Sequence, residues 1–329
     1  MAISILIQGR TEDLKISLLE PLNVEEGLIE KYKKQIEDLG HEFVSYGEKT
    51  TDKDELIKRS KDSEIIMIAN NPYPAEVIED SDKLQYLNVA FTGVDHVDVD
   101  ALKEKGAILS NASSYSDPAV AELVIGLILD LYREISLKNE EVRKRGLASL
   151  GREIKGKTVG IVGTGNIGTE TARLLKAFGA EVLGYDKEEK EDFKKLEGVY
   201  TSLDKLLRES DIVSIHLPVT ETTTRFMGEE EFGLMKKDAI LINCARGKVL
   251  DNDALAKALN QGEIAGAGVD VFDMEPPIPE DYPLLKAKNT ILTPHLAFFT
   301  QESMERRAHI AFDNTLAYLK GEIKNEIKL

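Results

Sequence analysis

The stretch KTVGIVGTGNIG, Lys157 to Gly168, decides the fold of this chain of 329 residues. An apolar strand runs directly into the pattern Gly163-x-Gly165-x-x-Gly168, and the residues that follow have helical periodicity. The first glycine permits a tight turn, the second lets a pyrophosphate approach the backbone, and the third lets helix and strand pack closely. Glycine-rich turns also occur for structural reasons alone, but this strand–turn–helix context predicts a dinucleotide site at the positive end of the helix dipole.

A carboxylate follows this turn at the expected distance. The next apolar strand, residues 181–185, ends at Asp186, roughly 20 residues beyond the turn. A carboxylate at this place accepts hydrogen bonds from the ribose hydroxyls and repels a 2′-phosphate. The sequence therefore predicts NAD as the cofactor, in preference to NADP, although Lys187 beside the acid weakens this preference slightly.

Short apolar strands alternate with amphipathic helices on both sides of this motif, and a long, mostly apolar helix capped by Asp117 separates two such series. The pattern predicts an α/β protein with two doubly wound domains, each built on a parallel sheet. The expected strands are 3–7, 43–46, 64–69, 86–90 and 107–109, then 158–162, 181–185, 212–215, 239–243, 267–271 and 291–292. The expected helices include 24–39, 54–59, 167–178, 203–209, 252–260 and 301–320, and the charged stretch 187–197 is expected to be a solvated face or loop.

Composition excludes several classes of function. No apolar run approaches the roughly 18 residues that span a bilayer, and the N-terminus resembles no signal peptide. A formal net charge of -17 repels nucleic acids and anionic membranes, so neither is an expected partner. One cysteine, Cys244, allows no intramolecular disulfide, and the five histidines lack ligand spacing. We therefore expect a cytoplasmic protein without a bound metal.

Three segments with chemically active side chains each follow a predicted strand of the second series. They contain Arg246, Glu275 and His295. Because the carboxyl ends of parallel strands face the ligand crevice, these side chains are expected near one another. An arginine binds and polarises a 2-oxo acid, a histidine gives and takes a proton, and a carboxylate orients the imidazole. This combination predicts hydride reduction of a 2-oxo acid, although each residue alone is more often structural.

At these residues the chain resembles the D-isomer-specific 2-hydroxyacid dehydrogenases, most densely between residues 160 and 297. In that family the NAD domain is inserted into the substrate domain. The resemblance implies a discontinuous, flavodoxin-like substrate domain of residues 1–115 and 296–329, and a Rossmann NAD domain of residues 116–295. It also implies the D configuration of the product.

The resemblance assigns roles residue by residue. Arg246, Glu275 and His295 match the catalytic residues of the family. Residues that match contacts to the cofactor are Gly163, Gly165, Asn166, Ile167, Gly168, Asp186, Leu217, Pro218, Thr223, Cys244, Ala245 and Asp270, the last holding the nicotinamide end. Residues that match contacts to the substrate are Thr92, Gly93, Arg246 and Phe298.

The identity of the substrate is open at this point. The aromatic pair Phe298-Phe299 is similar to the branch that acts on lactate and larger apolar 2-hydroxy acids, and the loop 70–73 is a candidate for closing over the substrate. Alternatives are a glyoxylate/hydroxypyruvate reductase, a phosphoglycerate dehydrogenase, or a non-catalytic NAD-sensing protein similar to a corepressor. The resemblance also implies a homodimer, with the helix from Asp117 and its extension to Arg145 as the expected contact.

Overall fold

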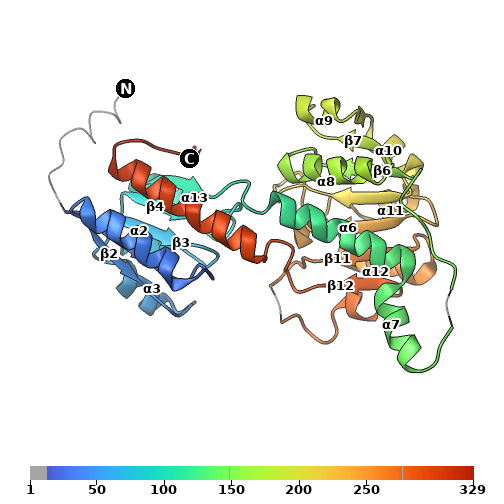
Figure 1. Ribbon diagram of the computed structural model, residues 1–329, viewed down its shortest axis with the longest axis horizontal. Coiled ribbons are helices and arrows are strands. Elements are labelled where there is room, and N and C mark those ends of the chain that lie inside the picture. The colour runs from blue at the N-terminus through green and yellow to red at the C-terminus, as the bar shows by residue number, and fades with distance from the viewer. Residues whose placement is uncertain (1–12, 148, 276) are drawn as a thin grey trace. The chain divides into compact units, whose positions relative to one another are not determined.

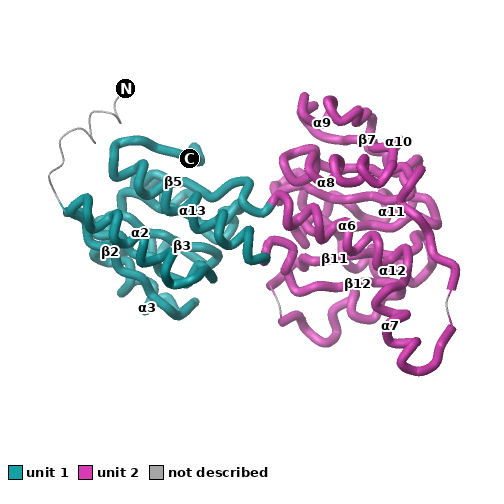
Figure 2. Tube along the Cα trace, in the orientation of Figure 1, with its two compact units in different colours: residues 1–116, 300–329 teal, residues 117–299 magenta. Residues whose placement is uncertain are grey.

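The computed structural model describes residues 13–147, 149–275 and 277–329, and the chain divides into two compact units (Figures 1 and 2). One unit consists of Met1–Ser116 and Thr300–Leu329, and the other of Asp117–Phe299. These divisions lie close to residues 115 and 295, where the family resemblance implied the domain boundaries. Both units are α/β with mostly parallel sheets, which confirms the predicted fold class. The strand expected at residues 3–7 lies outside the described residues.

The sheet of the second unit is parallel throughout, and its strand order reverses beside β6 (Thr158–Val162). This reversal makes a topological switch point between β6 and its neighbour β9, the place where open α/β sheets bind ligands. In spatial order the strands are β12 (Thr290–Leu292), β11 (Gly266–Val269), β10 (Ile240–Asn243), β9 (Ile212–Ile215), β6, β7 (Glu181–Tyr185) and β8 (Val199–Tyr200).

Alternating side chains of these strands form two cores, one on each face of the sheet. In β10, Leu241 joins one core, while Ile240 and Ile242 join the other. Helices α6 (Asp117–Arg133) and α8 (Asn166–Ala177) cover the second of these faces and pack against each other (Figure 1). The first is covered by α10 (Leu203–Glu209), α11 (Glu229–Leu234) and α12 (Asn252–Gln261).

Two local expectations for the second unit need correction. Asp117 is the first residue of α6 and not the residue before it, so its carboxylate lies in the first turn, where it interacts favourably with the helix dipole. The charged stretch 187–197 contains a short helix, α9 (Glu191–Lys195), because Phe193 is fully buried beneath it. A further helix, α7 (Ile135–Arg143), follows α6.

The first unit has the strand order of a flavodoxin-like sheet. Tyr32 of α2 (Glu26–Asp38) stacks on Phe312 of α13 (Gln301–Leu319), so two helices far apart in sequence share one core. Strands β2 (Glu42–Ser45), β1 (Lys15–Leu18), β3 (Ile65–Ile68), β4 (Tyr86–Val89) and β5 (Ile108–Asn111) are parallel, and β13 (Glu326–Ile327) is antiparallel to β5. The remaining helices are α3 (Lys53–Ser60), α4 (Ala75–Glu79) and α5 (Val99–Lys105).

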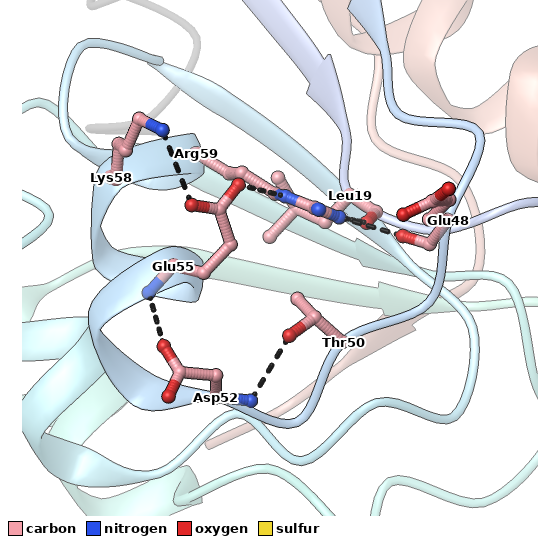
Figure 3. Close-up of polar contacts among 7 residues, drawn as sticks. All are labelled: Leu19, Glu48, Thr50, Asp52, Glu55, Lys58 and Arg59. Atoms are coloured by element: carbon pink, nitrogen blue, oxygen red, sulfur yellow. Dashed lines mark hydrogen bonds and ion pairs between the residues drawn. The ribbon is translucent and has the colours of Figure 1, made fainter.

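Arg59 ties α3 to the loops that follow β1 and β2 (Figure 3). Its Nη1 donates to the carbonyl oxygens of Leu19 at 3.0 Å and Glu48 at 2.7 Å, and its Nε donates to Glu55 Oε1 at 2.9 Å. Asp52 caps the helix by accepting from the Glu55 amide at 2.9 Å. These bonds satisfy backbone groups that would otherwise be unpaired where the loops pack on the helix.

Two features are absent from the described residues. None of their helices is both long enough and apolar enough to cross a bilayer. Within the same residues, no group of three or more histidine, cysteine or acidic side chains is arranged to hold a metal ion.

Candidate active site

The three glycines of the turn after β6 meet different steric demands. Gly163 has a φ of +98°, and a Cβ there would lie 2.7 Å from the carbonyl oxygen of His216 at the end of β9. A Cβ on Gly168 would lie 2.0 Å from the Gly163 oxygen, whereas one on Gly165 would meet nothing within 4 Å. The turn therefore needs glycine for its own packing at two positions and leaves open space at the third. Helix α8 begins there without a side-chain cap from Gly165, so the turn fits the pyrophosphate of a dinucleotide.

Asp186 lies beside this turn because β7 neighbours β6. Its Oδ2 accepts from the backbone amide of Thr164 at 2.7 Å and from the Thr164 hydroxyl at 3.1 Å. Its Oδ1 accepts from the Glu188 amide at 3.2 Å. The Lys187 ammonium is directed elsewhere, donating to Thr222 Oγ1 at 2.9 Å. The negative charge of Asp186 is thus fixed next to the glycine turn.

The segment after β9 forms a closed loop on the other side of the switch point. Thr223 Oγ1 donates to the Pro218 oxygen at 2.6 Å and accepts from the Thr220 amide at 2.7 Å. Leu217 packs against the turn, since a Cβ on Gly163 would lie 3.2 Å from its Cδ2. Asn166 and Ile167 occupy the first turn of α8.

Two other titratable side chains near these strand ends are unsuited to proton transfer or nucleophilic attack. Desolvation lowers the pKa of His216 to about 3, and its Nε2 lies 2.9 Å from Ser214 Oγ. Burial, with a further contribution from the charge of Asp270, raises the pKa of the Cys244 thiol well above its usual range. At neutral pH His216 is uncharged and Cys244 is a thiol, so both act as packing groups.

Because His216 is neutral in the folded chain, the stability of the fold should decrease in acid. Its pKa is lower in the folded chain than in the unfolded one, so its contribution to stability is present above the unfolded value and is lost as pH falls toward 3. Between pH 7 and pH 5 this loss is about 2 kcal/mol. We expect His216→Gln to unfold in urea with a smaller difference in free energy between these two pH values than the parent chain. Equal differences for the two proteins would contradict the assignment.

His295 and Glu275 form a direct pair. His295 Nδ1 lies 3.0 Å from both carboxylate oxygens of Glu275. An ionised carboxylate only accepts hydrogen bonds, so Nδ1 carries the hydrogen and Nε2 is the nitrogen that exchanges a proton. The imidazole side chain is 20% exposed and the Glu275 side chain 74% exposed. The ring of Phe298 meets the imidazole edge to face, with centroids 5.2 Å apart.

Arg246 occupies the loop between β10 and the 3-10 helix Gly247–Val249. Asn243 Nδ2 donates to the Arg246 backbone oxygen at 3.0 Å, and the Arg246 Nη1 donates to the Ala245 oxygen at 2.8 Å. A Cβ on Gly247 would lie 1.8 Å from the carbonyl carbon of Phe272, so this loop packs directly on the loop after β11. The structure therefore fixes the Arg246 loop at the same sheet edge as His295, which follows β12.

Thr92 and Gly93 follow β4 and belong to the first unit. The Thr92 backbone oxygen accepts from Asn111 Nδ2 at 2.7 Å, while its buried hydroxyl has no hydrogen-bond partner within the described part of the chain. The loop 70–73, a candidate either for closing over the substrate or for packing, is packed in this structure. Tyr73 is fully buried, and the Asn71 amide donates to Glu20 Oε1 at 2.8 Å, so the loop is packed into its own unit.

Asp270, after β11, is the residue whose surroundings the sequence did not reveal. Its fully buried carboxylate accepts three hydrogen bonds from the segment around His295. Burial raises the pKa of this carboxyl group, opposed by the hydrogen bonds from Thr293, Ala297 and Leu296. No sequence spacing signals these bonds, because they join residues more than 20 positions apart.

Comparison with known proteins identifies the chain. A family model for the NAD-binding domain of D-isomer specific 2-hydroxyacid dehydrogenases matches residues 125–297. The chain is 40% identical over 277 residues to the glyoxylate reductase of Korarchaeum cryptofilum, covering 82% of this chain and 83% of that relative. It is 34% identical over 303 residues to the hydroxypyruvate reductase of Blautia hydrogenotrophica, covering 89% and 94%.

Solved structures give the same result. The chain is similar to D-lactate dehydrogenase from Aquifex aeolicus complexed with NAD and lactic acid, with a TM-score of 0.81, 32% identity, and coverage of 93% of this chain and 96% of that one. The resemblance stated from the sequence is thereby confirmed, including NAD as the cofactor, and the alternative of a non-catalytic sensor is set aside. The chain belongs to the D-isomer-specific 2-hydroxyacid dehydrogenase family and is an NAD-dependent oxidoreductase.

Proposed function

We propose that this enzyme reversibly reduces a small 2-oxo acid to its D-2-hydroxy acid, with His295 as proton donor. The observation that carries the proposal is the contact between His295 Nδ1 and both oxygens of Glu275, at the sheet edge that also holds the Arg246 loop. NADH, when bound, supplies the hydride that reaches the carbonyl carbon. The residues of the chain then have to bind the carboxylate, polarise the carbonyl and deliver one proton.

Each of these tasks suits a particular side chain. Arg246 offers two parallel N–H groups to the substrate carboxylate and carbonyl oxygen. The imidazolium Nε2 of His295 gives its proton to the developing alkoxide, and in the reverse direction the neutral ring takes it back. Glu275 stabilises the imidazolium and holds its ring. In this scheme unit Met1–Ser116 with Thr300–Leu329 is the substrate domain, and Asp117–Phe299 the NAD domain.

The proposed contacts to the cofactor follow the glycine turn and the switch point. Gly163, Gly165, Asn166, Ile167 and Gly168 would bind the pyrophosphate, and Asp186 the adenosine ribose. The nicotinamide half would lie along the strand ends at Leu217, Pro218, Thr223, Cys244, Ala245 and Asp270. The open space at Gly165 supports the proposed pyrophosphate contacts. The Asp186 carboxylate, fixed beside the glycine turn, supports the proposed ribose contact.

Asp186→Asn tests the assigned preference for NAD. The amide oxygen can still accept from Thr164, but the negative charge that repels a 2′-phosphate is gone. We expect the ratio of kcat/KM for NADH to that for NADPH to fall about tenfold or more, since hydrogen bonds to charged groups contribute about 1.5–3 kcal/mol. Steady-state rates with both cofactors measure this ratio. An unchanged ratio would show that Asp186 does not select the cofactor.

Two substrate classes have separate support. The relatives named glyoxylate and hydroxypyruvate reductase favour a small, polar 2-oxo acid. Phe298, whose ring packs on the His295 imidazole, favours an apolar substituent such as the methyl group of pyruvate or a larger aliphatic chain, as in lactate and larger 2-hydroxy acids. The phosphoglycerate alternative falls in the same polar class and has the same kind of support, a relative named D-3-phosphoglycerate dehydrogenase.

Kinetics on a matched series separate the two classes. We would compare kcat/KM for glyoxylate, hydroxypyruvate, pyruvate and 2-oxoisocaproate in the parent enzyme and in Phe298→Ala. If Phe298 forms an apolar wall, its removal lowers kcat/KM for 2-oxoisocaproate most and for glyoxylate least. A parent enzyme that strongly prefers hydroxypyruvate, with Phe298→Ala affecting all four equally, would favour the polar class. No turnover of any of the four would overturn the proposed function.

We also propose a homodimer whose contact includes α7 and the segment after it. The apolar side chains of α6 pack inside their own unit, so the proposed contact uses the extension of this helix to Arg145. In contrast Ile135, Val142, Leu147 and Leu150 are exposed, the last two by 87% and 101%. A cluster of exposed apolar groups is typical of an interaction surface.

A reducing, cytoplasmic setting, without nucleic-acid or membrane partners, remains our expectation because Cys244 is a free thiol and the net charge is -17.

Sedimentation of charge variants tests the dimer. We expect the parent chain to sediment as a dimer and Val142→Glu to shift toward monomer, because a buried unpaired charge costs several kcal/mol at an interface. Val199→Glu, at a similarly exposed apolar side chain in β8, is the matched control and should remain a dimer. A parent chain that sediments as a monomer would rule the proposal out.

A further inference from the structure

Asp270 accepts hydrogen bonds from the His295 backbone amide and from residues on both sides of it. The Asp270 Oδ1 accepts from Thr293 Oγ1 at 2.5 Å and from the Leu296 amide at 2.9 Å, while Oδ2 accepts from the Ala297 amide at 2.9 Å. The backbone oxygen of Asp270 accepts from the His295 amide at 2.8 Å. Asp270, at the end of the neighbouring strand β11, therefore binds donors on both sides of His295 and the His295 amide itself.

This arrangement matters because His295 has an unfavourable backbone conformation. Its φ is +55°, in the left-handed region that is unfavourable for a residue with a Cβ. Such a conformation persists only where its surroundings determine it. If the segment relaxed toward a common φ, the imidazole would leave its position against Glu275 and Phe298.

The carboxylate of Asp270 is largely occupied by this task. Its two oxygens offer about four acceptor positions, of which three are used within the segment 293–297. The residue is fully buried in the described structure. A role limited to holding the nicotinamide end of the cofactor does not account for these three bonds, since they are present in the chain alone.

We propose that Asp270 is a positioning residue, whose carboxylate fixes the backbone of residues 293–297 and thereby aims the His295 imidazole at the reacting carbonyl. This inference rests on the proposed function of His295 as proton donor. An amide cannot replace the carboxylate here. Asparagine has one acceptor oxygen, and its NH2 group would face a backbone N–H, leaving buried donors unpaired.

Asp270→Asn tests this proposal with two independent readouts. We expect kcat at saturating NADH to fall about 30-fold, between the effects of a lost hydrogen bond and of a lost proton donor. We expect the dissociation constant of NADH, from fluorescence titration, to change far less than kcat, because the proposed pyrophosphate and ribose contacts after β6 and β7 are unaltered. Hydrogen exchange followed by mass spectrometry should show amide protons of residues 293–299 exchanging at least about tenfold faster, because local opening costs less.

Asp211→Asn is the matched control. Asp211 lies just before β9, at the amino ends of the strands, whereas Asp270 lies at their carboxyl ends. The Asp211 carboxylate also accepts from a backbone amide, that of Thr158 at 3.0 Å. This variant makes the same chemical change away from the candidate site. It should leave kcat and the exchange of residues 293–299 unchanged. A fall in kcat equal to that of Asp270→Asn would mean that general destabilisation explains both, and would overturn the proposal.

Thr293→Val provides the test if Asp270→Asn does not fold. It removes one donor and keeps the carboxylate. We therefore expect a three- to tenfold loss of kcat, the effect of losing about one neutral hydrogen bond, and faster amide exchange in the same segment. Weaker NADH binding with unchanged kcat in Asp270→Asn, or unchanged kcat and exchange in Thr293→Val, would overturn the positioning role. Failure of the proposed function would be visible separately, as a parent enzyme inactive on every 2-oxo acid or a His295→Ala enzyme with unaltered kcat.

Discussion

Replacing His295 with alanine is expected to lower kcat for 2-oxo acid reduction about 10³-fold, the range attributed to a positioned general acid. The pair with Glu275 fixes the ring by its Nδ1, so the proton reaches the substrate from Nε2. Without the imidazole, water is left as the proton donor to the alkoxide, and water is a far weaker acid than an imidazolium. The affinity for NADH should stay within about threefold, because the proposed pyrophosphate and ribose contacts lie after β6 and β7.

His309→Ala is the control for this variant. His309 lies on α13, and its Nδ1 is 2.7 Å from the Tyr32 hydroxyl, so it is a histidine with a polar partner but outside the candidate site. It should keep the parent kcat. Loss of NADH binding in His295→Ala, with kcat at saturating NADH preserved, would assign His295 to the cofactor and contradict its role as proton donor.

Replacing Arg246 with glutamine is expected to reduce kcat/KM for the 2-oxo acid about 10³-fold, which corresponds to about 4 kcal/mol. Two charge-assisted bonds, to the carboxylate and to the carbonyl oxygen, are lost together. Part of this loss should appear in KM, as ground-state binding of the carboxylate, and part in kcat, as weaker stabilisation of the alkoxide. Arg246→Lys should recover only part of the loss, because an ammonium cannot donate in parallel to two oxygens.

Arg173→Gln is the matched control for Arg246→Gln. Arg173 is exposed on α8, where it pairs with Glu170, and its loss should change neither constant. Because Arg246 Nη1 also bonds the Ala245 oxygen, thermal unfolding of each variant separates a stability defect from a catalytic one. A folded Arg246→Gln enzyme with parent kcat/KM would exclude arginine as the anion-binding group.

Much of the second unit was predictable from sequence because its strands are continuous apolar runs that end in glycine or polar residues. β6, β7 and β9 were predicted with the ends that the structure gives them. Their parallel arrangement then follows from the alternation with helices. The position of Arg246 and His295 at one sheet edge follows in turn, since parallel strands bring their carboxyl ends together.

The first unit was harder to predict for a physical reason. Its β1 is only four residues long, KISL, within a stretch rich in charged residues, yet it pairs with both β2 and β3. The charged neighbours of β1 hide its apolar pattern, and its burial comes from helices α2 and α13, which lie far apart in sequence. Short elements such as α4, α5, α11 and β13 were missed for the same reason.

Side-chain contacts in the candidate site were only partly accessible. The chemistry of Arg, Glu and His indicates a proton donor with its orienting carboxylate, but nothing in the spacing shows that Asp270 bonds backbone amides beyond His295. Likewise, the polar loop 70–73 suggested mobility, whereas tertiary packing buries Tyr73 and ties Asn71 to Glu20. Composition reports the tendency of a segment, and packing decides its outcome.

The most direct test of this account is the stereochemistry of the product. The purified enzyme would be incubated with NADH and pyruvate, and separately with hydroxypyruvate, while NADH absorbance is followed and the product is analysed by chiral chromatography. We predict one NADH consumed for each 2-hydroxy acid formed, and formation of the D isomer alone with at least one of the two substrates. An L or racemic product, or no consumption of NADH despite tight binding, would contradict the account.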